Sequence, residues 1–322
     1  MTTIDVFNGD ADGIFSLIQL RKAFPVSQSH LITSVKRDIS LLKQVDLELA
    51  KDADINVLDI SYDKNCNEVE SLLDKGNNIF YCDHHKADKL ISHTNLTSII
   101  DTSAFVCTGL LISNYIDRQH HLWAIAALFG DGLDKVAYEE VKAFNLPESD
   151  VEAIKKLGVL VNYNGYGSRI EELHFHPAEL YRELMRYSDP LEVIADKSSP
   201  FYRLETAFDS DMKNAQEYQA FHQSELVTAV RLPNETWSKR ISGTLGNKLS
   251  KQHPDKAILI LSDNPDKTIT VSLRAPKSKP YGASDICSQY PSGGGRASAA
   301  GVNELLDSEI QSIIEKVEHY YR

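Results

Sequence analysis

The sequence lacks the features of a membrane-spanning or secreted protein. It contains no run of about 18 apolar residues that would cross a bilayer. Its first residues have neither a basic start nor a long apolar stretch, which argues against a secretory signal. The four cysteines are scattered and form no Cys-x-x-Cys pair, which excludes a zinc knuckle and suits a reducing compartment. We therefore expect a cytoplasmic protein whose cysteines serve packing.

Basic residues are also in short supply. The chain has 34 Lys and Arg against 46 Asp and Glu, which gives a formal net charge of −12. Such a surface repels a long nucleic-acid backbone, whose binding depends on the neutralisation of many phosphates. A short anion held by metal ions and a few arginines remains compatible with this charge. The composition leaves the oligomeric state open, with a homodimer as one alternative.

Strand-like apolar runs alternate with helical stretches from the first residues to about residue 130. This alternation predicts an α/β domain with a mostly parallel sheet and helices on both faces. Residues 120–195 are helical in pattern and are expected to continue this domain. The expected strands are residues 4–7, 55–60, 79–82 and 99–100, and the expected helices are 14–24, 68–75 and 108–118.

A length of 322 residues exceeds the usual size of one hydrophobic core, so we expect two domains. The pattern turns polar at residues 196–200, and 203–226 then resembles one helix. The expected division is a larger α/β domain over 1–195, a helical connector over 196–226 and a smaller α/β domain over 227–322. The expected elements of the smaller domain are a helix over 242–253, strands over 257–261 and 268–273, a glycine-rich loop at 293–295 and a helix from 308.

Acidic residues follow the expected strands. Asp10 and Asp12 come after the first, Asp59 after the second and Asp83-His84-His85 after the third, while Asp131 follows an apolar helix. Each alone is also typical of a turn or a helix cap. The carboxyl ends of parallel strands share one edge of a sheet, so these side chains are expected to converge there.

Carboxylates combined with an imidazole are suitable ligands for manganese or magnesium, more than for zinc. Two such ions about 3.5 to 4 Å apart can stabilise both the attacking and the leaving oxygen of a phosphoryl transfer. The convergence therefore predicts a metal-dependent phosphoester chemistry. The pairs His120-His121 and His174-x-His176 have no such neighbours and are interpreted as surface or packing residues.

In order and spacing, these acidic and histidine residues resemble the four motifs of the DHH phosphoesterase family. The C-terminal segments Val271–Arg274 and Gly293–Gly301 look like the DHH-associated substrate domain with its glycine-rich signature. The resemblance covers essentially the whole chain, at a size like that of the family members that degrade very short RNA.

This resemblance implies that residues 1–195 form a metal-binding catalytic domain, which faces the substrate-binding domain of residues 227–322 across a cleft. It also implies a centre of two manganese ions, with magnesium or cobalt as alternatives. Asp10 and Asp59 would hold one ion. The other ion would be held by Asp12, Asp59, His84 and Asp131, so that Asp59 bridges the pair and is central to catalysis.

The resemblance also implies roles around the metals. Asp83 would orient His84, and His85 would face the scissile phosphate. Substrate binding would fall to Arg274, Gly293, Gly294, Gly295 and Arg296. The glycine run is either a flexible turn or a loop whose backbone N–H groups bind an anion, and we favour the second.

Two residues depart from the family pattern. Asn8 stands where many members have a metal-binding histidine, which weakens the first metal position. Arg296 stands where the glycine-rich signature commonly ends in histidine. Arginine stays charged at any working pH and can donate two hydrogen bonds to a phosphate, but it cannot shuttle protons.

The expected function is hydrolysis of short 5′-phosphorylated oligonucleotides, above all linear dinucleotides such as pGpG, to mononucleotides by metal-activated water. The family also includes cyclic dinucleotide phosphodiesterases, single-strand exonucleases of the RecJ kind, 3′-phosphoadenosine phosphatases and polyphosphate hydrolases. A shared fold does not choose among them. An alternative from another class is a catalytically weak nucleotide-binding sensor that has lost its first metal through Asn8.

Overall fold

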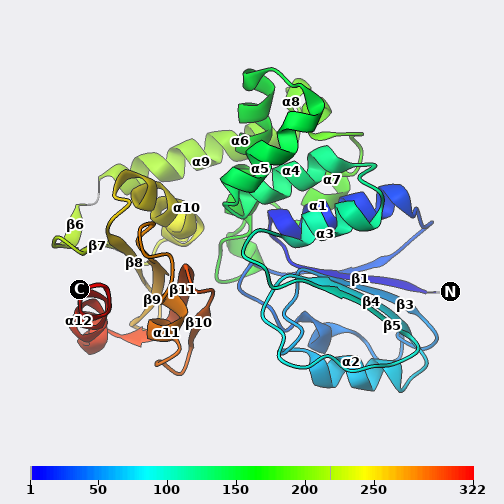
Figure 1. The fold of residues 1–322 in the computed structure, drawn as a ribbon, viewed down its shortest axis with the longest axis horizontal. Helices are drawn as coiled ribbons and strands as arrows, with labels where there is room; N and C mark the ends of the chain where they lie inside the picture. Colours follow the sequence, from blue (N-terminus) through cyan, green and yellow to red (C-terminus); the bar gives the residue numbers. More distant parts are fainter. Residues whose placement is uncertain (1, 218) are drawn as a thin grey trace. The chain divides into compact units, whose positions relative to one another are not determined.

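The computed structural model describes residues 2–217 and 219–322. The chain divides into two compact units, Met1–Thr206 and Ala207–Arg322 (Figure 1). No helix in the described residues combines the length and the apolar character needed to cross a bilayer. All four cysteines are free thiols, and Cys82, Cys107 and Cys287 are buried, as packing residues are.

The N-terminal unit is built on a five-stranded sheet in the order β2-β1-β3-β4-β5, with every strand pair parallel. This confirms the predicted parallel sheet. In this order the chain reverses direction across the sheet between β1 and β3, and ligands bind beyond the carboxyl ends of strands at such a point. The strands are β1 (Thr3–Phe7), β2 (His30–Ile32), β3 (Asp54–Leu58), β4 (Asn78–Asp83) and β5 (Leu96–Ile100).

Helices cover both faces of this sheet (Figure 1). On one face lie α1 (Ala11–Ala23), α3 (Thr108–Tyr115) and α4 (His121–Gly130), and on the other lies α2 (Cys66–Leu73). Side chains alternate between faces along a strand, so alternate residues of β3 and β4 pack toward α2. The resulting core combines strand residues Ile55, Val57, Ile79 and Tyr81 with helix residues Val69, Leu72 and Leu73.

The helical continuation of this unit packs closely on α4. A Cβ atom on Gly158 of α6 (Glu148–Asn164) would lie 2.2 Å from the carbonyl oxygen of Ala126, so the crossing requires glycine there. This close approach fixes the end of α4, where Asp131 follows. The remaining helices of the unit are α5 (Asp134–Val141), α7 (Pro177–Leu184), α8 (Pro190–Ala195) and the first part of α9 (Pro200–Gln216).

The C-terminal unit has a six-stranded sheet in the order β10-β11-β9-β8-β7-β6. Its pairs are antiparallel except for β7 with β8, which are parallel. Its elements are β6 (Ala220–Gln223), β7 (Val227–Leu232), α10 (Thr236–Gln252), β8 (Ala257–Asp263), β9 (Thr268–Arg274), α11 (Ala283–Cys287), β10 (Gly293–Gly295), β11 (Ala299–Leu306) and α12 (Ile310–Tyr321).

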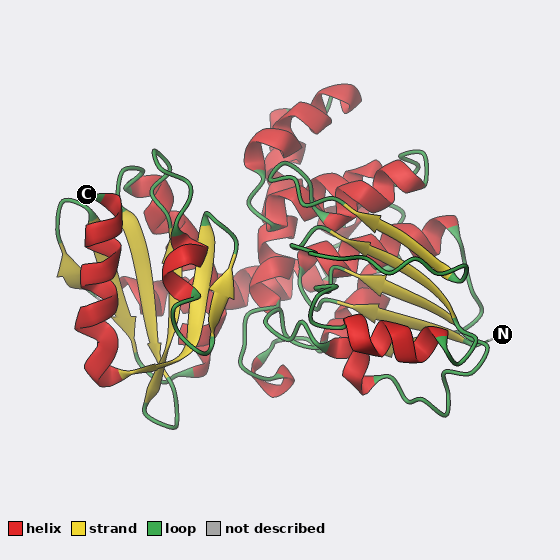
Figure 2. Ribbon diagram, turned by 60° about the horizontal axis from the view of Figure 1, so that its bottom comes forward, coloured by secondary structure: helices red, strands yellow, loops and turns green. Residues whose placement is uncertain are grey.

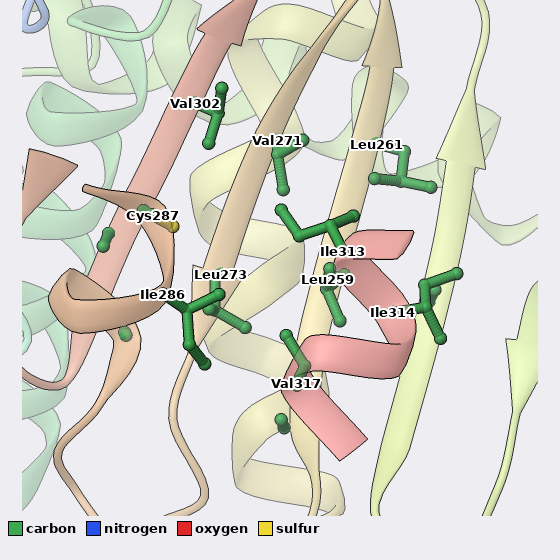
Figure 3. Packing of buried hydrophobic residues seen from close by; sticks show 14 of the residues in the cluster. Leu259, Leu261, Val271, Leu273, Ile286, Cys287, Val302, Ile313, Ile314 and Val317 are labelled. Atoms are coloured by element: carbon green, nitrogen blue, oxygen red, sulfur yellow. The ribbon is translucent and has the colours of Figure 1, made fainter. Parts of the chain in front are cut away.

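Helices α11 and α12 pack on one face of this sheet, as Figures 2 and 3 show. Leu259, Val271 and Leu273 of the strands face Ile313 and Val317 of α12, and all of them are fully buried. Burial of one such side chain contributes about 1.5 to 3 kcal/mol. Helix α10 contacts β8 and β9, and its Gly246 faces Ile260 and Arg274, which point away from this core.

Two local expectations were wrong. The helix expected over 203–226 ends at Gln216, and Ala220–Gln223 forms β6 instead, because this segment pairs with β7. The glycine run at 293–295 is a strand paired with β11, not a loop. A Cβ atom on Gly293 would lie 1.8 Å from the carbonyl oxygen of Cys287, so close packing on α11 explains this glycine.

Candidate metal centre

The acidic residues after β1 are placed by the start of α1. The backbone N–H of Asn8 still donates to Leu58 of β3, at 3.2 Å, and the chain then turns into the helix. Asp10 is the N-cap of α1 and accepts a hydrogen bond from the backbone N–H of Gly13 at 3.1 Å. Asp12 therefore lies in the first turn of the helix, and both carboxylates are buried at the carboxyl edge of the sheet.

Asp59 follows β3 in a left-handed backbone conformation with φ +58°. Its N–H donates to the carbonyl of Cys82 on β4, at 3.0 Å, which extends the strand pairing by one residue before the chain turns. Aspartate tolerates this region better than most side chains, but the conformation is strained. The strain is located at a buried carboxylate in the centre of the cluster.

Three carboxylates converge on one imidazole nitrogen. His84 Nε2 lies 3.4 Å from Asp59 Oδ1, 3.6 Å from Asp12 Oδ2 and 3.8 Å from Asp131 Oδ2. The other ring nitrogen, Nδ1, is 3.1 Å from the carbonyl oxygen of Val106 and must carry the proton to donate to it. In the neutral ring, Nε2 is then the nitrogen without a proton, and this is the form that binds a metal. The structure thus brings together the four residues predicted for one metal position.

Asp83 has a different partner from the one expected. Its Oδ1 lies 2.7 Å from His85 Nδ1, whereas His84 is oriented by the Val106 carbonyl. The prediction that Asp83 orients His84 was therefore wrong, because consecutive residues after a strand point in different directions. Burial alone would lower the pKa of His85, but Asp83 outweighs it and raises that pKa above its usual value. His85 is also more accessible, with 27% of its side chain exposed against 4% for His84.

Asp12 links the cluster to α3. Its two oxygens accept the backbone N–H groups of Thr108, at 2.8 Å, and Gly109, at 2.7 Å. These N–H groups belong to the first turn of α3, and N–H groups in the first turn of a helix have no partners within the helix itself. The residue at the helix start, Cys107, makes no side-chain capping bond. Asp12 therefore caps a helix that is nearly one hundred positions away in the sequence.

One charged residue of the centre was not predicted. Lys36 lies after the short strand β2, and its ammonium contacts the carboxylate of Asp10 and lies 2.8 Å from Asn162 Oδ1 and 3.6 Å from Asp131 Oδ1. Burial alone would lower its pKa, but the opposing effects of Asp10, Tyr166 and Asp131 raise that pKa above the usual value. The sequence signal for Lys36 is its position just after β2, the strand that pairs with β1. This strand is too short and too exposed to be recognised from the sequence.

The electrostatics of the cluster favour a bound cation. Burial, followed by the charges of Asp12 and Asp10, raises the pKa of Asp59 well above its ordinary value. Burial also raises the pKa of Asp12, against the opposing effect of His84. For Asp10 burial acts in the same direction, but Lys36 outweighs it and lowers the pKa. Adjacent buried carboxylates repel one another unless a cation neutralises them, and here the ammonium of Lys36 contacts Asp10 and lies 3.6 Å from Asp131 Oδ1.

The predicted substrate-binding residues lie in the C-terminal unit, at one end of its sheet. Arg274, at the end of β9, donates to Asn247 Oδ1 at 2.8 Å and to Ser272 Oγ at 2.9 Å. Arg296 lies in the turn between β10 and β11 and exchanges two backbone hydrogen bonds with Ala299, which pairs with Arg274 across the sheet. The two arginines therefore belong to the same corner of this unit.

Residues 223–322 match the DHHA1 domain family. The C-terminal unit carries a DHHA1 domain. This bears out the family resemblance of its glycine-rich segment, and the matched region begins at the last residue of β6. A comparison with curated protein sequences found no match.

Solved structures with the same fold include DHH proteins. A DHH-domain structure described as a member of the s1p family of ribosomal proteins aligns with a TM-score of 0.65 at 15% identity, over 99% of this chain and 86% of that one. The exonuclease RecJ bound to manganese gives 0.61 at 14%, over 99% and 90%. A pGpG-specific phosphodiesterase, PggH from Vibrio cholerae, gives 0.53 at 11%, over 100% and 99%. The resemblance to DHH phosphoesterases is thus confirmed for the fold and for the DHHA1 domain.

Proposed function

We propose that this protein is a manganese-dependent phosphodiesterase that cleaves short 5′-phosphorylated oligonucleotides, above all linear dinucleotides such as pGpG, into mononucleotides. The observation that carries the proposal is the convergence of Asp12, Asp59 and Asp131 on His84 Nε2, at 3.4 to 3.8 Å. This donor set lies beyond the carboxyl ends of parallel strands, where α/β folds bind their ligands.

The chemistry of the donor set fits a divalent cation. Carboxylate oxygens with one neutral imidazole match the preferences of manganese or magnesium, and Asp12, His84 and Asp131 would hold it together with Asp59. When bound, such a cation supplies Lewis-acid chemistry: it lowers the pKa of water and stabilises negative charge on phosphoryl oxygens. The sequence predicts a second ion at Asp10, a position that Lys36 contacts in this structure.

The residues beside the donor set have complementary tasks. Asp83 accepts from His85 Nδ1 and favours the imidazolium, which can stabilise the charge that develops on a phosphoryl oxygen. His85 suits this task because it is the most accessible of the converging side chains. In the DHHA1 domain, Arg274 and Arg296 would bind a terminal phosphate of the substrate, since arginine donates paired hydrogen bonds to phosphate.

Three considerations support this substrate class. The fold is shared with RecJ and with the pGpG-specific phosphodiesterase, which favours phosphodiester chemistry over an unrelated activity. A net charge of −12 disfavours a long nucleic-acid substrate. The paired arginines of the DHHA1 domain suit an end group of a short molecule.

The test is an assay of the full chain with manganese against a substrate panel. The panel comprises pGpG, other 5′-phosphorylated dinucleotides, a five-residue RNA, cyclic dinucleotides, phosphoadenosine phosphate and polyphosphate, with products separated by chromatography. The variant Asp59→Asn, purified in parallel, controls for a contaminating nuclease. Asparagine is chosen because it tolerates the left-handed backbone at residue 59.

We expect rapid conversion of dinucleotides to mononucleotides by the natural chain and none by Asp59→Asn. If another member of the panel is cleaved faster, the protein would still be a phosphoesterase, but that compound would replace dinucleotides as its proposed substrate. Cleavage of no member, together with measurable nucleotide binding, would replace the enzyme by a nucleotide sensor.

A further inference from the structure

The two sides of the metal centre differ in what surrounds the carboxylates. On the His84 side, three carboxylate oxygens face one ring nitrogen. On the Asp10 side, an ammonium is already in contact with the carboxylate. The inference that follows rests on the proposed function, because it concerns the metal requirement of the same centre.

Lys36 is held in place at its backbone. Its N–H donates to the carbonyl oxygen of Gly165 at 2.9 Å, just beyond α6. Its own carbonyl oxygen accepts from Asn8 Nδ2 at 3.3 Å, just beyond β1. The residue is thus fixed between two elements of the site, with only 19% of its side chain exposed.

The ammonium of Lys36 has oxygen acceptors on several sides. It contacts Asp10 Oδ2, lies 2.8 Å from Asn162 Oδ1 and is 3.6 Å from Asp131 Oδ1. An ammonium has three N–H donors, so these oxygen acceptors can surround it much as ligand oxygens surround a metal ion. The other oxygen of Asp10 accepts from the backbone of Gly13 at 3.1 Å. Both oxygens of Asp10 therefore have partners within the chain.

Asn8 completes the contrast. Its amide is neutral, and Nδ2 is used by the backbone of Lys36. Its Oδ1 is buried and has no hydrogen-bond partner among the described residues. A neutral amide oxygen is a weaker cation ligand than a carboxylate, so Asn8 does little to attract a second divalent ion against the repulsion of the ammonium.

We infer that the ammonium of Lys36 permanently takes the place of one divalent cation, so that the centre binds a single manganese ion, at His84. Lys36 neutralises and positions Asp10, which in turn caps α1. The positive charge of Lys36 then adds to that of the single ion in catalysis. This charge is part of the protein, so it does not depend on a supply of metal in the cell.

The experiment counts bound manganese in the full chain. Protein freed of metal by a chelator is titrated with manganese chloride by calorimetry, and bound manganese is measured by elemental analysis after equilibrium dialysis. We expect one ion per chain in the natural protein and two in Lys36→Met, which removes the charge but keeps a side chain of similar length. Lys36→Arg, which retains a positive charge, is expected to stay at one.

A matched control is Lys86→Met. Lys86 follows His85 directly, but its side chain is 81% exposed and pairs with Asp88, so its removal is expected to leave the count at one. Two ions in the natural chain, no ion in it, or one ion in a folded Lys36→Met variant would each overturn the inference.

Electron paramagnetic resonance of the manganese-loaded natural chain gives an answer that does not depend on the folding of a variant. An isolated ion is expected, and the spectrum of an exchange-coupled pair would contradict the inference. Neither readout requires turnover. If the substrate panel shows no cleavage while the count changes from one to two, the proposed function fails and the role of Lys36 stands.

Discussion

Both units of the chain have an apolar core, but they differ in the charged side chains that they bury. In the N-terminal unit, carboxylates and histidines are buried together beyond the ends of parallel strands, at a cost that a cation must offset. In the DHHA1 domain the burial is apolar, and α11 and α12 cover one face of a mixed sheet. Arg296 of this domain is exposed at a turn. Under the proposed function, this difference would assign the chemistry to the first unit and substrate capture to the second.

The largest expected effect comes from Asp59→Asn. The substitution keeps the size and the backbone preference of the residue but removes a negative charge from the centre of the cluster. We expect kcat to fall by at least about 10³-fold, as for the loss of a major electrostatic element of a site. Steady-state kinetics and manganese calorimetry of the same sample would check it. Unchanged turnover would remove catalysis from the N-terminal unit.

His85→Ala tests the same unit with a smaller effect. The imidazole lies 2.7 Å from Asp83 and is the accessible member of the cluster, so we expect kcat to fall by about 10² to 10³-fold with manganese affinity retained. His93→Ala, an exposed histidine after the same motif, is the control. If manganese affinity falls by the same factor as kcat, His85 would be a metal ligand and not a residue that contacts the substrate phosphate.

Leu259→Ala addresses the apolar unit. This side chain is fully buried in the sheet core, so its truncation is expected to destabilise the DHHA1 domain by about 2 to 5 kcal/mol. Each unit contains one of the two tryptophans, Trp123 in α4 and Trp237 in α10. Denaturant titrations of Trp123→Phe and Trp237→Phe backgrounds would follow the units separately.

We expect the Trp237 signal to shift to lower denaturant in Leu259→Ala while the Trp123 signal and manganese binding stay in place. Leu306→Ala, at a side chain of the same sheet that is 56% exposed, should change little. Parallel shifts of both signals would mean that the two units unfold as one.

The smallest expected effect is that of Arg296→Ala. Loss of a charged donor to a substrate phosphate costs about 1.5 to 3 kcal/mol, so KM should rise by roughly 10 to 100-fold with kcat nearly unchanged. Lys277→Ala removes one exposed positive charge from the same domain and serves as the control. A fall in kcat without a change in KM would move Arg296 from substrate capture to the reaction itself.

The sequence predicted those parts of the structure in which local pattern and tertiary structure agree. The apolar runs before Asp10, Asp59 and Asp83 are strands whose ends converge, and this placed the donor set around His84. Lys36 could not be found in the same way, because β2 has three residues with no buried apolar run. The partner of Asp83 depends on side-chain direction after the strand, which spacing alone does not determine.

The C-terminal errors have a similar cause. Ala220–Gln223 becomes a strand only through its pairing with β7. The local sequence pattern of this segment does not reveal that pairing, because the partner strand lies outside the segment. The glycines at 293–295 were expected in a loop, whereas they form a strand in which Gly293 lies close to the Cys287 carbonyl. Anion binding by their backbone N–H groups stays a prediction. Glycine alone does not distinguish close backbone packing from ligand binding.

The two hydrogen bonds that Asp12 accepts from the start of α3 have a genetic consequence. If the proposed metal centre is correct, mutations of Asp12 have two effects, because this residue would bind the metal and it also caps a distant helix. A null phenotype at Asp12 would report misfolding and inactivity together. His85, which caps no helix, is the better position for an allele that produces a stable but inactive protein in the cell.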